Sequence, residues 1–369
     1  MKKVDFGIKG AYGEKNFGDD VLLFFLEQWA NKNGLKPYFV GRRAAYISKL
    51  FPNIKYITKE DHHKYFFNTL LLGGGTQFFS FKQIKEKNSI IKLFISNPFL
   101  FLRKVITYFE KRFIYNQKNY DSLYALGIGF GPFIKNSEQE LSAKEQLSLM
   151  KGVYPRDRFS QDFSKKYNKN TIEGTDICFL PNIIKYEFLE NKKQQIKNIG
   201  IIVRDWEYLN GGEKYLEKIF KELENPLFDN YNVEFIFFKD EKISEIKILK
   251  KGYNITRWNP ENKSIYKFLE VLSTYDLFIS ARFHGVIFGS LLNIPSIVIE
   301  VEPKLNVTKE LLGKGVYIWK QPFDENLGNI IKTIPYIEMK KHLKNNVVIQ
   351  AKKAEKMFEH LTNRLINEK

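Results

Sequence analysis

An arginine and a histidine stand together where a buried strand gives way to a helix. Residues 277–280 have the apolar run of a strand and residues 285–292 have the pattern of a helix, so Arg282 and His284 fall between them. Free amides at the start of a helix attract anions, and a guanidinium adds a full positive charge. An imidazole exchanges protons near neutral pH. The sequence therefore predicts an anion site with a proton donor or acceptor beside it, rather than a core histidine.

A second arginine occupies the same position relative to another strand. Arg204 follows the apolar residues 199–203 directly. In open α/β sheets, ligands bind beyond the carboxyl ends of the strands, so Arg204 is predicted to point into the same cleft. A salt bridge to Asp205 or Glu207 is the alternative.

A glycine-rich loop follows the first predicted strand. The loop GAYGEKNFGDD, residues 10–20, precedes an amphipathic helix that is expected to begin at Asp19 or Asp20. Its glycines let a ligand approach the backbone, whereas a tight turn with Asp19 as N-cap is the alternative. Because one carboxylate is enough for capping, the other is predicted to accept hydrogen bonds from a hydroxylated ligand.

A second glycine-rich loop, LLLGGGTQFF at residues 70–79, follows another buried strand. Three consecutive glycines cost backbone entropy, so they indicate close approach by a ligand or by another stretch of backbone. Packing alone is the alternative.

Short apolar strands alternate with amphipathic helices through both halves of the chain. Strands are predicted at residues 4–8, 70–72, 122–127, 199–203, 233–238, 277–280 and 296–301. This alternation predicts an α/β protein with parallel sheets. A charged, amide-rich stretch at 188–198 separates the two sets of strands. We therefore expect two doubly wound Rossmann-like domains facing across a cleft, at residues 1–190 and 196–336, and a basic helix at 337–369 that packs across both.

Composition limits the classes of function. The 369 residues include 43% hydrophobic and 27% charged residues, which excludes an intrinsically disordered chain. A net charge of +17 predicts an anionic partner. Nucleic acid is not expected, because the basic residues are dispersed and no nucleic-acid module is recognisable. Cys178 is the only cysteine, and no segment has the pattern of a signal peptide or a membrane span, so a cytoplasmic location is expected.

Taken together, these segments resemble the polysaccharide pyruvyl transferase family. The matching pieces follow the family's order and are NFGDD (16–20), GGGTQ (73–77), GIGFGP (127–132), PRDRFSQDF (155–163), GTD (174–176), Arg204, YDLFISARFHGVIFGSLLNIPSI (275–297) and Lys304. Each motif alone is weak, but the ordered set is specific. Phe283 replaces the small aliphatic residue that the family usually has between the arginine and the histidine, and residues 81–119 match nothing in the family.

The resemblance implies a fold like that of GT-B glycosyltransferases and transfer of pyruvate from phosphoenolpyruvate to two hydroxyls of a sugar, forming a cyclic ketal and releasing phosphate. Phosphoenolpyruvate is then a co-substrate, and no cofactor or metal ion is expected. Arg204 and Arg282 are assigned to its phosphate and carboxylate, because planar guanidiniums bind such groups bidentately. Phe283, Gly285 and Lys304 are assigned to the same site.

His284 is assigned as general acid or base, and Asp19 or Asp20 as the group that orients or deprotonates the acceptor hydroxyl. The acceptor-binding candidates come from the two glycine-rich loops and are Asn16, Gly18, Gly74, Gly75, Thr76 and Gln77. A nucleotide-sugar glycosyltransferase of the same architecture is the alternative, since a diphosphate also requires arginines and helix amides.

Residues 85–118 concentrate positive charge and aromatic rings. Eight lysines and arginines against two glutamates leave +6 there. This mixture is typical of a segment that lies on anionic lipid, whereas a helical excursion packed on the first domain is the alternative. We expect a lipid-linked acceptor, part of a bacterial surface-polysaccharide precursor, and peripheral binding at the inner face of the cytoplasmic membrane.

Overall fold

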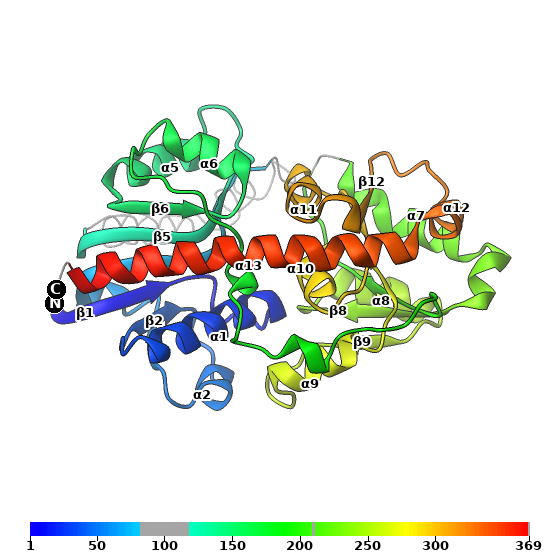
Figure 1. Cartoon of the computed structure of the whole chain (residues 1–369), viewed down its shortest axis with the longest axis horizontal. Coiled ribbons are helices and arrows are strands. Elements are labelled where there is room, and N and C mark those ends of the chain that lie inside the picture. The colour runs from blue at the N-terminus through cyan, green and yellow to red at the C-terminus, as the bar shows by residue number, and fades with distance from the viewer. Residues whose placement is uncertain (82–117, 209–210, 368–369) are drawn as a thin grey trace, which may run out of the picture.

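The computed structural model describes residues 1–81, 118–208 and 211–367, and in it the chain forms two α/β units side by side (Figure 1). The strands of the first unit are β1 (Lys2–Lys9), β2 (Tyr38–Gly41), β3 (Lys55–Thr58), β4 (Tyr65–Phe78), β5 (Tyr120–Phe130) and β6 (Gly152–Pro155). Those of the second are β7 (Asn198–Ile202), β8 (Asn232–Phe237), β9 (Ile255–Arg257), β10 (Leu277–Ser280), β11 (Ser296–Ile299) and β12 (Val316–Trp319). The basic, aromatic segment expected at 81–119 lies almost wholly outside the described residues.

Each unit is built on a parallel sheet of six strands. The strand orders are β3-β2-β1-β4-β5-β6 and β12-β11-β10-β7-β8-β9. Every strand pair in both sheets is parallel. Numbered from its own first strand, each sheet has the order 3-2-1-4-5-6 of a Rossmann fold, so the predicted doubly wound fold is confirmed twice.

Helices connect the strands. They are α1 (Phe17–Lys32), α2 (Tyr46–Leu50), α5 (Glu138–Leu149), α6 (Arg158–Lys165), α7 (Tyr215–Leu223), α8 (Lys242–Lys250), α9 (Ile265–Leu272), α10 (Phe283–Leu291), α11 (Val307–Leu312), α12 (Leu327–Thr333) and α13 (Tyr336–Asn367). In the described part of the chain, no helix combines the length and the apolar content that crossing a bilayer requires.

Helix α1 begins at Phe17, two or three residues earlier than the sequence predicts. Asn16 is its N-cap, and the Asn16 side chain accepts a hydrogen bond from the backbone N–H of Gly18. Asp19 and Asp20 therefore lie in the first turn, where negative charge is favoured. Because neither carboxylate caps the helix, both are available for other contacts.

The two units meet at an aromatic core around Phe17. The Phe17 ring contacts rings of the second unit at centroid distances of 4.7 to 5.2 Å, those of Phe238, Trp258, Phe268 and Phe288. The backbone N–H of Phe17 also donates to the Phe238 carbonyl at 2.8 Å. The start of α1 is thus part of the core that joins the units.

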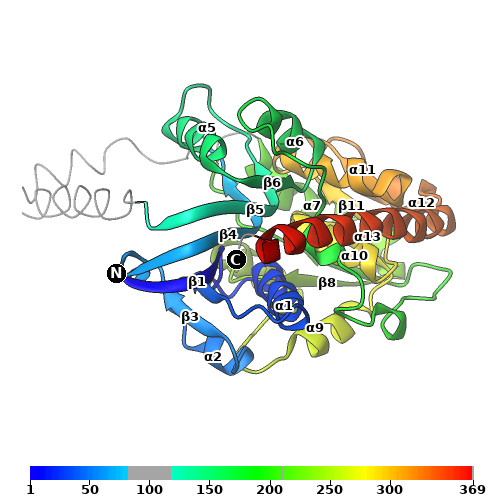
Figure 2. The same cartoon turned by 60° about the vertical axis from the view of Figure 1, so that its left-hand side comes forward.

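Helix α13 spans both units, as Figures 1 and 2 show from two sides. Near its start, the Lys340 ammonium donates to the Asn191 carbonyl at 2.8 Å. Near its end, the Thr362 hydroxyl accepts from the Trp29 indole of the first unit at 3.1 Å. This long helix therefore fixes the orientation of one sheet relative to the other.

Candidate active site

The predicted site residues follow the carboxyl ends of strands in both sheets. Arg204 follows β7, Arg282 follows β10 and Lys304 comes shortly after β11, while Asp19 reaches the same region from the start of α1. The charges of His284 and Arg282 act on the Asp19 carboxylate, so the two units present their groups to a common site. This arrangement is the one that parallel α/β sheets use for ligands.

Arg282 is held by two partners at the start of α10. Its Nε donates to the Val203 carbonyl at 3.1 Å, and its Nη2 forms an ion pair with Glu241, a buried residue after β8. Burial, reinforced by the nearby charge of Arg204, lowers the pKa of Arg282. The guanidinium is therefore oriented by the protein before any ligand binds.

Arg204 pairs with Glu302 and not with either of its near neighbours in sequence. The Asp205 carboxylate instead accepts hydrogen bonds from the first amides of α8. Glu302 is fully buried and also pairs with Lys304, at 2.8 Å. Burial alone would raise the pKa of Glu302, but the charges of Lys304 and Arg204 outweigh it and lower that pKa. Burial also lowers the pKa of Lys304 to about 8.

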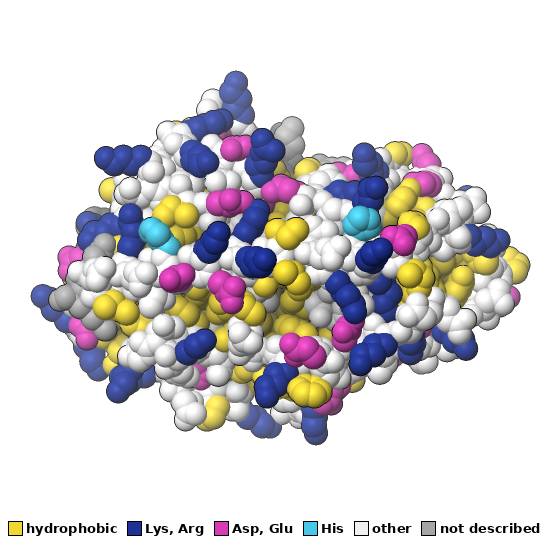
Figure 3. Space-filling view, viewed as in Figure 1, with side chains coloured by type: hydrophobic (Ala, Val, Ile, Leu, Met, Phe, Trp, Pro, Cys, Tyr) yellow, Lys and Arg dark blue, Asp and Glu magenta, His cyan; other side chains and the backbone are white. Residues whose placement is uncertain are grey.

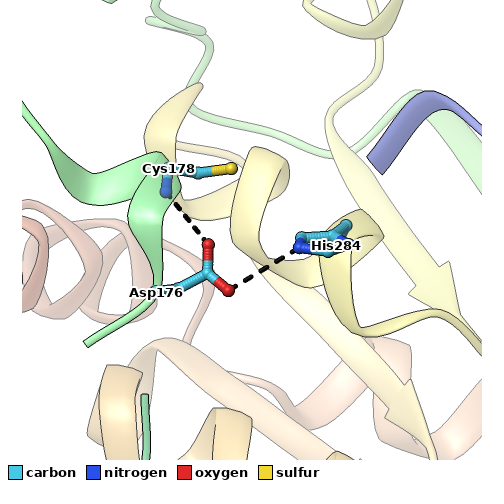
Figure 4. Close-up of side chains that lie close together, drawn as sticks. All are labelled: Asp176, Cys178 and His284. Atoms are coloured by element: carbon cyan, nitrogen blue, oxygen red, sulfur yellow. Dashed lines mark hydrogen bonds and ion pairs between the residues drawn. The ribbon is translucent and has the colours of Figure 1, made fainter. Parts of the chain in front are cut away.

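His284 lies at the contact between the two units, as Figure 4 shows for its Asp176 side. Its Nε2 is 3.6 Å from Oδ2 of Asp176, which belongs to the GTD motif. Its Nδ1 packs on Gly18, where a Cβ atom would come within 2.4 Å. The glycine at position 18 is thus what lets the imidazole approach the start of α1.

Asp19 keeps one carboxylate oxygen available. Its Oδ2 accepts a hydrogen bond from the Asn16 amide at 2.6 Å, while Oδ1 lies 4.0 Å from the position of a Cβ on Gly75. Burial raises the pKa of Asp19, although His284 and other neighbours oppose that effect. A carboxylate with a raised pKa is suited to accept a proton from a hydroxyl.

Asp20, the other predicted catalytic carboxylate, has a structural position. It is fully buried, and its two oxygens accept hydrogen bonds from the Tyr46 hydroxyl at 2.7 Å and the Trp258 indole at 2.9 Å. Because both oxygens are engaged, Asp20 links the two units and does not belong to the candidate catalytic group.

Two residues assigned to the anion site are packing residues. Phe283 is buried, and its ring lies under the Arg156 guanidinium at 4.1 Å. Gly285 faces Ser280, whose hydroxyl would be 2.5 Å from an added Cβ, so its small size serves the contact of α10 with β10. Phe283 orients a cation, and Gly285 allows close helix packing.

The GGGTQ loop is divided between packing and the site. Gly74 has a left-handed φ of 74° and faces Leu22, whereas Gly75 has a φ of 75° and faces Asp19. The Thr76 hydroxyl accepts from Arg156 at 2.9 Å, and the Gln77 amide donates to the Gly74 carbonyl at 3.3 Å. Gly75 is thus the loop glycine beside the candidate catalytic carboxylate.

Sequence reasoning missed four charged residues of the site, which are Arg156, Asp176, Glu241 and Glu302. Arg156 lies in the PRDRFSQDF motif and Asp176 in the GTD motif, but neither residue has a predicted role. Arg156 directly follows β6, so the strand-end argument that found Arg204 could have found it. The two glutamates carry no such signal, because the arginines with which they pair are distant in sequence.

A hollow of about 480 Å³ opens between the units beside these residues. It is lined by residues of both units, which are Gly13, Glu14, Lys15, Arg42, Arg43, Ala44, Ala45, Tyr46, Lys239, Asp240 and Glu261. Lys239 of this lining acts electrostatically on Asp19, and Tyr46 of the lining donates a hydrogen bond to Asp20.

Substituting Gly18 by alanine is expected to lower kcat at least tenfold while the fold persists. The new Cβ would lie 2.4 Å from Nδ1 of His284, so the imidazole must move away from the site. Alanine is the better helix former by about 1 kcal/mol, which protects α1. Steady-state kinetics and thermal denaturation measure the two effects. Full activity in this variant would show that the imidazole position is unimportant.

The family model of polysaccharide pyruvyl transferases matches residues 16–303, which is about three quarters of the chain. None of the curated proteins matches the chain. Among solved structures, the S. aureus MnaA-UDP co-structure has a TM-score of 0.58 at 15% identity and covers 99% of this chain and 97% of that one. A putative UDP-N-acetylglucosamine 2-epimerase from Listeria monocytogenes has a TM-score of 0.56 at 9% identity, with 99% and 98% covered.

These structural likenesses concern the fold, and they agree with two Rossmann-like units of the GT-B type. The family match includes the segments that bring Asp19, Asp176, Arg204, Arg282 and His284 together. The chain therefore belongs to the polysaccharide pyruvyl transferase family, and it is a transferase with a GT-B-like fold.

Proposed function

We propose that the chain transfers the pyruvyl group of phosphoenolpyruvate to two hydroxyls of one sugar in a surface-polysaccharide precursor. The observation that carries the proposal is that Arg204, Arg282 and Lys304 follow three neighbouring strands of one sheet, where Arg204 acts electrostatically on both other cations. Asp19 of the other unit interacts with Arg282 and His284. Phosphoenolpyruvate presents a phosphate and a carboxylate on a three-carbon frame. Two planar guanidiniums at neighbouring strand ends match these two anions.

The buried glutamates support this role. A guanidinium has five N–H donors, and Glu241 and Glu302 use only part of those on Arg282 and Arg204. The remaining donors are held in fixed directions, which reduces the ordering cost of binding an anion. Lys304 adds a third cation, paired with Glu302.

The reaction requires two additions at C2 of phosphoenolpyruvate. One sugar hydroxyl adds to C2 while C3 takes up a proton, and the C2–O bond to phosphate then breaks to leave an oxocarbenium. The second hydroxyl attacks C2 and loses its proton, which closes the ketal. In this proposal His284 moves these protons, Asp19 holds or deprotonates a hydroxyl, and the arginines stabilise the departing phosphate.

A nucleotide-sugar glycosyltransferase is the second candidate, because the structural neighbours include a UDP complex and a glycosyltransferase from Rickettsia africae. A nucleotide diphosphate would also need arginines and helix amides. The family match favours the pyruvyl transferase.

One experiment separates the two. Purified protein is incubated with phosphoenolpyruvate and a panel of lipid-linked and free oligosaccharides, and released phosphate and acceptor mass are measured. The expected product is an acceptor that has gained one pyruvic acid less one water, with one phosphate released. Transfer from a nucleotide sugar, together with absence of phosphoenolpyruvate binding by calorimetry, would overturn the proposal.

We further propose that the chain binds anionic membranes, where a lipid-linked acceptor resides. Helix α8 supports this, because Ile243, Ile246 and Leu249 are 55%, 71% and 56% exposed and lie among lysines such as Lys242 and Lys250. Apolar side chains that recur along one helix beside cations suit a lipid surface. Lysines and arginines are also spread over the face shown in Figure 3.

Vesicle sedimentation tests this surface. The protein is expected to sediment with phosphatidylglycerol-containing vesicles and not with pure phosphatidylcholine, and Ile246→Glu is expected to weaken that binding several-fold. Ile337→Glu, at an exposed isoleucine of α13, is the control. Equal binding to both vesicle types, or no effect of Ile246→Glu, would contradict the proposal.

A further inference from the structure

Asp176 of the GTD motif uses one carboxylate oxygen for structure and directs the other at His284. Its Oδ1 accepts a hydrogen bond from the backbone N–H of Cys178 at 3.0 Å, which caps the short helical turn Ile177–Phe179. Its Oδ2 lies 3.6 Å from Nε2 of His284, as the dashed line in Figure 4 shows. The carboxylate and the imidazole come from different units of the protein.

Both facing atoms are buried and have no other partner. Within the described part of the chain, Oδ2 of Asp176 and Nε2 of His284 have less than 1 Å² of exposed surface and make no other hydrogen bond. A buried carboxylate oxygen without a donor is costly, so its place opposite a ring nitrogen requires a reason. Burial alone would raise the pKa of Asp176, but His284, followed by Arg156, outweighs it and lowers that pKa.

We propose that Asp176 is a positioning residue for His284 in the pyruvyl transfer. The carboxylate accepts a hydrogen bond from Nε2–H, which fixes the tautomer and the ring orientation and leaves Nδ1 to exchange protons with the substrate. This inference rests on the proposed function. A separation of 3.6 Å is longer than a hydrogen bond, and catalytic contacts of this kind tighten when substrate binds.

The charge that forms on His284 during proton transfer explains what the Asp176 carboxylate contributes. When Nδ1 takes the proton of an acceptor hydroxyl, the ring becomes an imidazolium, and the Asp176 carboxylate stabilises that charge without accepting the proton. Gly18, which approaches Nδ1, is followed directly by Asp19, and Asp19 interacts electrostatically with His284. In this proposal an acceptor hydroxyl binds between that carboxylate and the ring nitrogen. Arg282 acts electrostatically on Asp19, and Arg156 acts on Asp176, so a cation stands near each of the two carboxylates.

A metal ion is the competing use of the same side chains. The ligand atoms of Asp176, Cys178 and His284 lie within 4.8 Å of one another. A thiol binds metal as the thiolate, and burial raises the pKa of Cys178 well above its usual value, followed by the effect of Asp176. Because the Cys178 thiol is hard to deprotonate there, the Asp176–His284 contact is favoured over a metal site that uses Cys178.

Asp176→Asn is the decisive variant, because asparagine can keep the oxygen that caps the Cys178 amide while an uncharged NH2 group, which cannot accept the Nε2–H hydrogen bond, replaces the oxygen that faces His284. We expect kcat to fall at least a hundredfold while the dissociation constant for phosphoenolpyruvate stays within threefold. The NMR titration of the His284 ring protons, assigned with His284→Gln, should differ from that of the wild type, because the charge opposite Nε2 is gone.

Two further variants separate positioning from folding. Asp276→Asn removes another fully buried carboxylate, one that binds the backbone amides of Lys197 and Asn198. It should lower the melting temperature without changing kcat or the His284 titration. Asp176→Glu keeps the charge and should retain at least a tenth of wild-type kcat, which decides the question if the asparagine variant does not fold.

The outcomes also separate this inference from the proposed function. Unchanged kcat and an unchanged His284 titration in Asp176→Asn would overturn the inference alone. Wild-type protein that neither binds nor consumes phosphoenolpyruvate would overturn the proposed function, while the NMR titration would still test the contact. Stoichiometric zinc or cobalt in the purified protein, lost in Cys178→Ser, would also overturn the inference.

Discussion

Arg282→Gln is expected to lower kcat/KM for phosphoenolpyruvate by about a thousandfold. Hydrogen bonds to charged groups contribute about 1.5 to 3 kcal/mol each, and a guanidinium that binds an anion bidentately makes two of them. The loss is therefore about 3 to 6 kcal/mol, where each tenfold step corresponds to about 1.4 kcal/mol. Phosphate release at limiting phosphoenolpyruvate measures it.

The substitution also leaves Glu241 buried without its cation, which destabilises the fold. Removal of one partner of a buried ion pair typically costs about 3 to 5 kcal/mol. The double variant Arg282→Gln with Glu241→Gln should regain stability but not activity. Arg257→Gln, which breaks the Arg257–Glu245 pair of the same unit, is the control and should keep its activity. Normal kinetics in the double variant would show that Arg282 does not belong to the site.

Asp20 is expected to make the protein less stable as the pH rises from about 4 to about 7. Burial raises the pKa of Asp20 to about 7, against 3.8 for an exposed aspartate. Between these values the folded state holds a proton that the unfolded state has lost, so the free energy of unfolding falls with rising pH. A difference of about three pKa units corresponds to about 4 kcal/mol, fully lost above pH 7.

Asp20→Asn should remove this dependence. An asparagine can accept from the Trp258 indole and donate to the Tyr46 oxygen, so the contact between the units survives. Urea denaturation at pH 4.5 and pH 8 should show that the variant gains stability relative to wild type only at the higher pH. Asp276→Asn provides a control of opposite sign, because the pKa of Asp276 is lowered by hydrogen bonds that outweigh its burial. Parallel pH curves for wild type and Asp20→Asn would contradict the assignment.

The positions of Arg204 and Arg282 could be predicted because apolar strands that alternate with helices form parallel sheets, whose carboxyl ends lie at one edge. The partners of these arginines could not be predicted, because only the order of strands in the folded sheet brings Glu302 opposite Arg204. The different roles of Asp19 and Asp20 were readable in principle. Successive side chains on a helix point about 100° apart, so two adjacent carboxylates cannot both face one ligand.

The glycines show a different limit. A run of glycines indicates close approach, but the sequence does not say what approaches. Gly74 and Gly285 admit other parts of the protein, Gly18 admits the imidazole of His284 and Gly75 faces Asp19. Each of these roles depends on a neighbour brought in by tertiary structure.

The aromatic junction at Phe17 determines what any hinge motion would do to the chemistry. Phe17 is two residues from Asp19, and its ring contacts four rings of the second unit. If α1 rotated with the first sheet, these contacts would break and Asp19 would move away from His284. Opening the molecule far enough to break this junction would also separate Asp176 from His284. The aromatic junction and the Asp176–His284 contact therefore depend on the same arrangement of the two units, so a substitution that loosens the junction at Phe17 should also disturb the histidine.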